Sequence, residues 1–175
     1  NKSNYHFYNK WGAVYAGVQR ANDVLRIMKK ATDIKPEDAK RIAGEARFLR
    51  AHYHFEAIKM WHKVPFVDET VSYESGNYYL PNDTLIWPAI ERDFQYGVDN
   101  LPPAQTTIGI GRANRYAAKA YLAKAYMFQN KFEAARPLLL DLIANGMTAG
   151  GKQYALVNYS DNFNPATKNS GEAVF

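Results

Sequence analysis

The residues best suited to chemistry are two histidines and a glutamate that lie close together, His52, His54 and Glu56. Imidazole nitrogens and carboxylates are common zinc ligands. In a helix, however, residues two positions apart point about 200° apart, so the two histidines cannot bind the same ion. His52 and Glu56 lie one turn apart, but two ligands are too few for a zinc site. We therefore expect no metal site and no cofactor.

The other residue types used in catalysis form no recognisable site. Cysteine is absent, which excludes thiolate nucleophiles, disulfides and thiolate metal sites. The serines lie outside any hydrolase motif, and no pair of acidic residues occupies an apolar setting suited to acid–base catalysis. Gly109 and Gly111 lack the strand and helix context of a phosphate-binding loop. The sequence therefore predicts that the protein is not an enzyme.

An aromatic loop is the remaining candidate site. Residues 66–85 contain Gly, Ser, Asn, Asp and Pro together with three tyrosines and show no helical period. Flat rings stack on sugar faces, and tyrosine hydroxyls or side-chain amides bind sugar hydroxyls. The alternative is that the rings anchor the loop to neighbouring helices. The candidate ligand-binding residues are Tyr73, Asn77, Tyr78, Tyr79 and Trp87, with Tyr78 and Tyr79 the strongest.

Charge and hydropathy exclude two further classes of partner. The chain of 175 residues has a formal net charge of +5, but its basic residues alternate with acidic ones, as at Arg41, Glu45 and Arg47. This pattern is typical of a solvated helix surface, so we expect no nucleic-acid partner. No apolar run approaches the roughly 20 residues needed to cross a bilayer.

Two long amphipathic helices must position this loop. In residues 7–30 and 36–61, apolar side chains recur every three or four positions, which is the period of a helix with a buried face. Val64-Pro65 should end the second helix, because proline lacks a backbone donor and favours extended geometry before it. Arg47 and Arg50 lie on this apolar helix and should form a structural clamp with a carboxylate or carbonyl partner.

A third helix is expected after the loop. It should begin between Asp83 and Pro88, with Asp83 or Thr84 as its N-cap, and should end at Leu101-Pro102-Pro103. The stretch that follows, residues 106–111, is expected to be flexible.

The clearest helical pair lies in residues 114–146. Asn114 can cap the first helix, Asn130-Lys131 forms a tight turn, and Gly146 can stop the second helix. Two helices of nearly equal length with small Ala residues resemble a tetratricopeptide repeat, although Lys119 stands at its first aromatic position. A generic helical hairpin is the alternative reading. One such repeat cannot bury its own face, so neighbouring helices must stack on it.

These patterns together predict an all-α fold of about six helices. We expect tetratricopeptide-like helical pairs joined by long irregular loops, within one helical domain that spans residues 1–175. The short apolar run at the end of the sequence suggests that the natural protein continues, so the chain is expected to be a fragment of a longer one.

Several segments together resemble the SusD/RagB family. The run Glu45-Ala46-Arg47-Phe48-Leu49-Arg50-Ala51, followed by Val64-Pro65, is similar to the family's signature. Further landmarks with similar order and spacing cover nearly the whole chain: Ala21-Asn22-Asp23-Val24-Leu25, Leu101-Pro102, Gly111-Arg112, Leu122-Ala123 and residues 172–175. One departure is Trp61-His62-Lys63, where the family has Tyr-Gly before Val-Pro.

This resemblance implies a cell-surface, outer-membrane lipoprotein of Bacteroidetes-type bacteria. Such a protein captures oligosaccharides, or in some members peptides, and delivers them to a SusC-like TonB-dependent barrel transporter. It would be held at the membrane only through a lipid anchor, which this chain lacks. The residues identify neither the ligand nor the interface with the transporter. The alternative function is a tetratricopeptide-type scaffold for protein–protein interaction.

Overall fold

The computed structural model describes residues 4–105 and 109–175 of the chain. Within these residues the fold contains five α-helices and two short 3-10 helices, and its β structure is limited to one bridge between Met147 and Gln153. The helices are α1 (Tyr5–Lys30), α2 (Pro36–Trp61), α3 (Trp87–Asn100), α4 (Arg115–Phe128), α5 (Phe132–Asn145), η1 (Tyr159–Phe163) and η2 (Pro165–Thr167). The all-α prediction is therefore confirmed. The flexibility expected for residues 106–111 falls partly outside the described residues.

The chain forms two compact units, which we describe separately. Unit 1 comprises Asn1–Asp93 and unit 2 comprises Phe94–Phe175. Helix α3 therefore begins in unit 1 and ends in unit 2. The prediction of a single helical domain over residues 1–175 stays a prediction.

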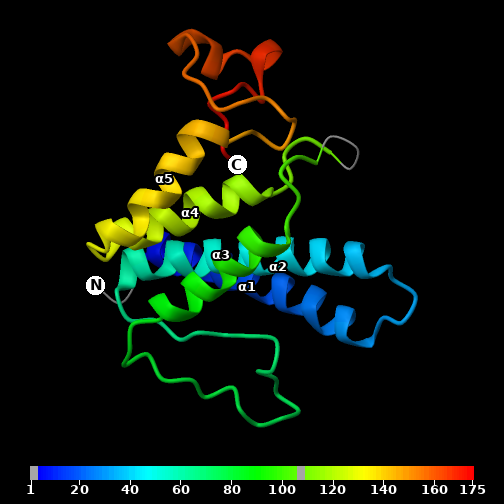
Figure 1. The fold of residues 1–175 in the computed structure, drawn as a ribbon. Coiled ribbons are helices and arrows are strands. Elements are labelled where there is room, and N and C mark those ends of the chain that lie inside the picture. Colours follow the sequence, from blue (N-terminus) through cyan, green and yellow to red (C-terminus); the bar gives the residue numbers. More distant parts are fainter. Residues whose placement is uncertain (1–3, 106–108) are drawn as a thin grey trace. The chain divides into compact units, whose positions relative to one another are not determined.

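In unit 1, α1 and α2 lie side by side and run in opposite directions (Figure 1). The side chain of Asn4 caps α1 by accepting the backbone N–H of His6 (3.1 Å), and Lys29 and Lys30 occupy its last turn, where cations complement the helix dipole. Helix α2 begins at Pro36, which suits a first turn because it has no N–H to satisfy. Apolar side chains of both helices are fully buried, including Val18 of α1 and Phe48 and Phe55 of α2.

The close contact between α1 and α2 requires a glycine at position 17. A Cβ added to Gly17 would lie 2.3 Å from the ring of Tyr53, whereas a Cβ added to Gly12 would meet nothing within 4 Å. Replacement of glycine by alanine should therefore have opposite effects on stability at these two positions of α1.

We expect Gly17→Ala to destabilise unit 1 by about 1–3 kcal/mol, because it overpacks the interface. Gly12→Ala is the matched control, and it should stabilise by about 0.5–1 kcal/mol through helix propensity alone. Urea unfolding followed by tryptophan fluorescence measures both changes. A stabilising Gly17→Ala would contradict the contact.

Helix α3 begins at Trp87, further along the chain than an N-cap at Asp83 or Thr84 would place it. Ile86, and not Asp83 or Thr84, precedes α3, and its carbonyl accepts the N–H groups of Ala89 (3.0 Å) and Ile90 (3.2 Å). The reason is Pro88, because its ring would clash with the carbonyl four residues earlier, at Thr84, and it has no N–H to bond that carbonyl, so the helix cannot extend upstream. Its end at Asn100, just before Leu101-Pro102-Pro103, agrees with the prediction.

In unit 2, α4 and α5 form the predicted helical hairpin (Figure 1). Asn114 caps α4 by accepting the N–H of Ala117 (2.7 Å), and Asn130 turns the chain with a positive φ of 59°. Lys119, which departs from the repeat pattern, forms an ion pair with Asp141 of α5. The cation thus joins the two helices where the repeat would place a ring.

Helix α5 ends at Gly146, as expected, but for a different reason. Gly146 has an extended backbone (φ −63°, ψ 139°) and not a left-handed one. A Cβ there would lie 2.3 Å from the carbonyl oxygen of Leu142 and 2.5 Å from the ring of Tyr154. Glycine is needed here because a side chain would clash with these atoms, and not because of the backbone conformation.

No helix in the described part of the chain is long and apolar enough to span a membrane. Nor do the described residues place three or more His, Asp or Glu side chains together in a way that could hold a metal ion.

Candidate functional site

The chain between α2 and α3 is irregular, and its first part is fixed to α1. Side chains of α1 donate hydrogen bonds to four main-chain carbonyls: Tyr15 to Pro65 (2.9 Å), Asn22 to Val67 (3.0 Å), and Arg26 to Glu69 (3.0 Å) and Val71 (2.9 Å). Backbone carbonyls outside regular secondary structure still need hydrogen-bond donors, and here side chains of α1 supply them. These bonds give the loop a fixed base on unit 1, from which its aromatic second part projects.

Arg50 of α2 ties this base to α3. Its guanidinium donates two hydrogen bonds to the carboxylate of Asp93 (2.6 and 2.8 Å) and further bonds to Glu69 (2.6 Å) and to the side-chain oxygen of Asn22 (2.9 Å). Arg50 and Asp93 are both almost fully buried. A forked guanidinium matches a carboxylate in this way with strong, directional bonds. The clamp predicted for Arg50 therefore exists, with Arg47 at its edge, 3.8 Å from Asp93.

Burial and charge act against each other in this cluster. Burial lowers the pKa of Arg50, but Asp93 and Glu69 outweigh it, so the net pKa is raised. Burial raises the pKa of Asp93, despite its bonds to Arg50. Burial also raises the pKa of Glu69, but hydrogen bonds and charge from Arg50 dominate and hold that pKa at about 2. Glu69 is thus ionised whenever unit 1 is folded near neutral pH.

His54 uses both of its ring nitrogens in contacts within unit 1. One ring nitrogen lies 3.0 Å from the carbonyl of Arg50, and the other accepts the N–H of Val67 (3.2 Å). Burial lowers the pKa of His54 to about 3, so the ring is neutral, with a donor on one nitrogen and an acceptor on the other. The first contact fixes the ring on α2, and the second holds the loop against α2.

Three of the five candidate ligand-binding residues come together as an exposed cluster of rings. The centroids of Tyr73 and Tyr78 lie 4.7 Å apart, and those of Tyr78 and Tyr79 lie 4.6 Å apart, with rings tilted by 44° and 38°. Tyr73 and Tyr79 are 85% and 86% exposed, and Tyr78 is 42% exposed. Rings this exposed cannot anchor the loop to a helix. We call Tyr73, Tyr78 and Tyr79 the tyrosine cluster.

Asn77 holds the loop in shape. Its side-chain oxygen accepts the N–H of Ser72 (2.8 Å), and its side-chain nitrogen donates to the carbonyl of Thr70 (3.1 Å). Next to it, Gly76 turns the chain with a φ of 66°. These bonds place Tyr78 and Tyr79 beside Tyr73, so Asn77 positions the cluster.

Trp87 lies at the start of α3, where its ring packs against Phe55 of α2 with centroids 5.6 Å apart. Its ring is only partly exposed. Trp87 therefore helps to attach α3 within unit 1, and its membership of a binding surface stays a prediction.

The sequence pattern does not show which residues support the tyrosine cluster. Arg26 has the pattern of an ordinary position on a helix face, and Asn22 stands out only as part of a segment that resembles the family. Glu69 and Asp93 give no signal as partners of Arg50. The one available sign was the pair of arginines on an apolar helix, which indicates that a carboxylate must lie nearby but not which one.

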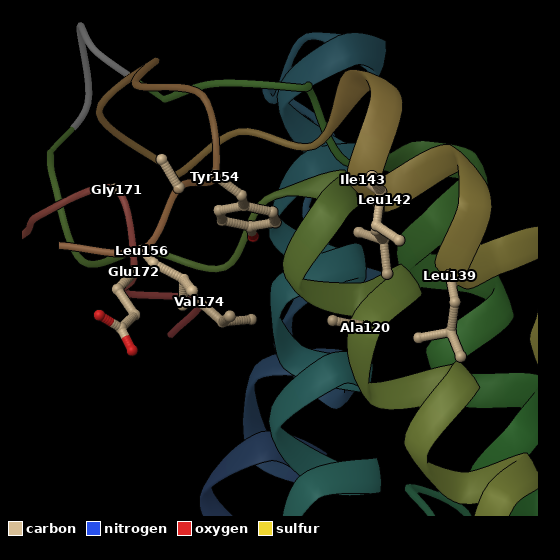
Figure 2. A pocket seen from close by; sticks show the side chains of 10 residues that line it. Ala120, Leu139, Leu142, Ile143, Tyr154, Leu156, Gly171, Glu172 and Val174 are labelled. Carbon is tan, nitrogen blue, oxygen red and sulfur yellow. The ribbon is translucent and has the colours of Figure 1, made fainter.

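A second candidate is an apolar pocket of about 530 Å³ in unit 2 (Figure 2). Figure 2 shows Leu139, Leu142 and Ile143 of α5 on one side and Leu156 on the other. Burial raises the pKa of the Tyr154 hydroxyl to about 12, and this hydroxyl has no hydrogen-bond partner in the described part of the chain. Walls this apolar offer few partners for sugar hydroxyls, so the pocket is a poor glycan site.

The chain is similar to several known proteins. A family model described as "Starch-binding associating with outer membrane" matches residues 1–127. SusD-like protein P25 of Formosa agariphila is 25% identical over 94% of this chain and 31% of its own length. The solved structure of a SusD-like protein from Bacteroides fragilis has the same fold, with a TM-score of 0.81 and 22% identity over 95% of this chain and 32% of its own.

A solved laminarin-binding SusD-like protein is 25% identical, with a TM-score of 0.72, and the match covers 88% of this chain and 33% of that one. This chain thus spans about a third of the length of the relatives that it matches. Since the family model matches well over half of its residues, the chain belongs to the SusD-like family.

Proposed function

We propose that this chain is part of a surface glycan-binding protein, and that the tyrosine cluster contacts the glycan. The observation that carries the proposal is a set of three exposed rings, with Tyr78 in contact with both Tyr73 and Tyr79. They lie on a loop whose base is fixed by part-buried hydrogen bonds to α1. A binding surface needs flat rings held in place before the ligand arrives, because ordering them on binding would reduce affinity. The action is binding without bond chemistry.

The family and its relatives support this proposal. The family description names starch binding and association with the outer membrane, and one relative of known structure binds laminarin. Peptides remain the alternative ligand class, since rings and amides suit them too. We infer further that the full-length protein is lipid-anchored at the cell surface and delivers its ligand to a SusC-like TonB-dependent transporter.

Removing single rings should weaken glycan binding. In the full-length protein, Tyr78→Ala and Tyr79→Ala are each expected to lower affinity roughly threefold to tenfold, since one stacked ring contributes about 0.5–1.5 kcal/mol. Calorimetric titration with laminarin and xyloglucan oligosaccharides measures this, with circular dichroism as the folding control.

Tyr159→Ala is the matched control for these variants. Tyr159 is 80% exposed and contacts a neighbouring ring, Phe163, at 5.0 Å, but it lies in unit 2. Its loss should leave affinity unchanged. Unchanged affinity in well-folded Tyr78→Ala and Tyr79→Ala proteins would remove the cluster from the binding site.

The transporter is tested separately. A stable complex should bury above about 2,000 Å², so a large barrel protein should co-purify with the full-length protein from gently solubilised membranes. Recovery of the full-length protein alone would count against the delivery role, while leaving glycan binding intact.

A further inference from the structure

The tyrosine cluster lies in the most one-sidedly charged stretch of unit 1. Residues 66–86 contain Asp68, Glu69, Glu74 and Asp83 but no Lys, Arg or His, although the whole chain has a formal charge of +5. Glu74 directly follows Tyr73, and both Glu74 and Asp83 are exposed. A ligand stacked on Tyr73 is therefore next to a residue with an exposed carboxylate, Glu74, and Asp83 follows Tyr79 by four residues.

The cations that contact this stretch are already engaged by it. Lys29 lies 3.2 Å from a carboxylate oxygen of Glu69, and Arg26 donates to Asp23 and to main-chain carbonyls of the loop. Arg50 is buried and bound to Asp93 and Glu69. A carboxylate or sulfate on a ligand would have to compete with these bonds for a positive partner.

The exposed carboxylates, in contrast, remain directed to solvent. Neither Glu74 nor Asp83 forms an ion pair with any residue that the structure describes. Like charges repel, and physiological salt screens exposed charges over about 8 Å. An anionic sugar stacked on Tyr73, which precedes Glu74 in the chain, should therefore be repelled at low salt and less so as the salt concentration rises.

We propose that this site selects uncharged glycans and rejects sulfated or uronate-bearing ones. The inference rests on the proposed function and adds the substrate class. The rings supply affinity for any sugar face, and the acidic loop provides the discrimination, with Glu74 and Asp83 as its specificity-determining residues.

The test uses the full-length protein with pairs of glycans that share a backbone: laminarin with sulfated laminarin, and xyloglucan with its carboxymethylated form. At low salt each neutral glycan should bind at least about fivefold more tightly than its anionic partner, and the difference should shrink as salt rises. The double variant Glu74→Gln/Asp83→Asn should raise the affinity for the anionic glycans about threefold relative to the affinity for the neutral ones.

Glu133→Gln is the matched control, because Glu133 is an exposed acid in the first turn of α5, in unit 2. Glu133→Gln should change neither the affinity for the neutral glycans nor the affinity for the anionic ones. Equal or tighter binding of the anionic glycans by the wild-type protein would overturn the inference while leaving glycan capture intact. Binding of no glycan from either set would overturn the proposed function and this inference with it.

Discussion

Arg50→Met is expected to lower the free energy of unfolding of unit 1 by about 3–5 kcal/mol, because it leaves a buried carboxylate without its cation. Asp93 is 3% exposed and takes two hydrogen bonds from Arg50. Asn22, which is fully buried, loses a bond in the same step. The base of the aromatic loop loses its link through Glu69 as well.

The measurement can be confined to unit 1. All three tryptophans, Trp11, Trp61 and Trp87, lie within Asn1–Asp93, so fluorescence during urea unfolding reports on this unit. Arg47→Met is the matched control: Arg47 is one turn away on α2, 32% exposed and 3.8 Å from Asp93. It should change stability by less than about 1 kcal/mol, as surface ion pairs do.

A double variant separates loss of charge from loss of packing. Arg50→Met/Asp93→Leu removes both charges and should recover much of the lost stability, since apolar replacement of a buried pair is often neutral or better. If Arg50→Met were as stable as Arg47→Met, the clamp would contribute nothing, and the loop would have to be held by other contacts.

The ion pairs of Arg50 also predict how the stability of unit 1 depends on pH in acid. The pKa of Glu69 is held at about 2 in the folded protein, below its ordinary value of 4.5. The resulting stability is complete above pH 4.5 and is lost as the pH falls toward 2, because the unfolded chain binds the proton first. In Arg50→Met this part of the acid dependence should become smaller, with Lys29 and a backbone hydrogen bond still lowering the pKa of Glu69.

Helix positions could be predicted because they depend on local pattern. The apolar period and the proline stops located α1 and α2, whose observed bounds are Tyr5–Lys30 and Pro36–Trp61. The end of α2 is less regular. His62 ends this helix with a φ of 63°, a conformation that glycine adopts most readily.

The site was predicted less completely, because its geometry depends on contacts between distant residues. Loop composition indicated Tyr73, Tyr78 and Tyr79. The role of Asn77 could not be seen, since it requires a turn that brings Thr70 and Ser72 onto its side chain. Likewise, nothing in the sequence pairs Arg50 with a carboxylate 43 residues away.

Asn114 combines a predictable role with an unpredictable one. Its side-chain oxygen caps α4, as expected from its place before the helix. Its side-chain nitrogen donates to the carbonyls of Pro103 (2.7 Å) and Met147 (2.8 Å), on the two chain segments that flank the hairpin. Asn114 is fully buried, so each of these carbonyls depends on it.

Asn114→Ala should therefore destabilise unit 2 by on the order of 3 kcal/mol, about 1 kcal/mol for the lost cap and the rest for carbonyls left without a donor. Asn114→Ser keeps a capping oxygen but neither long bond, so it should recover only the first part. Hydrogen exchange of α4 amides, followed by mass spectrometry, reports the stability of this unit, which has no tryptophan. If the serine variant protected α4 as well as asparagine does, the long bonds would be dispensable and Asn114 would be a cap alone.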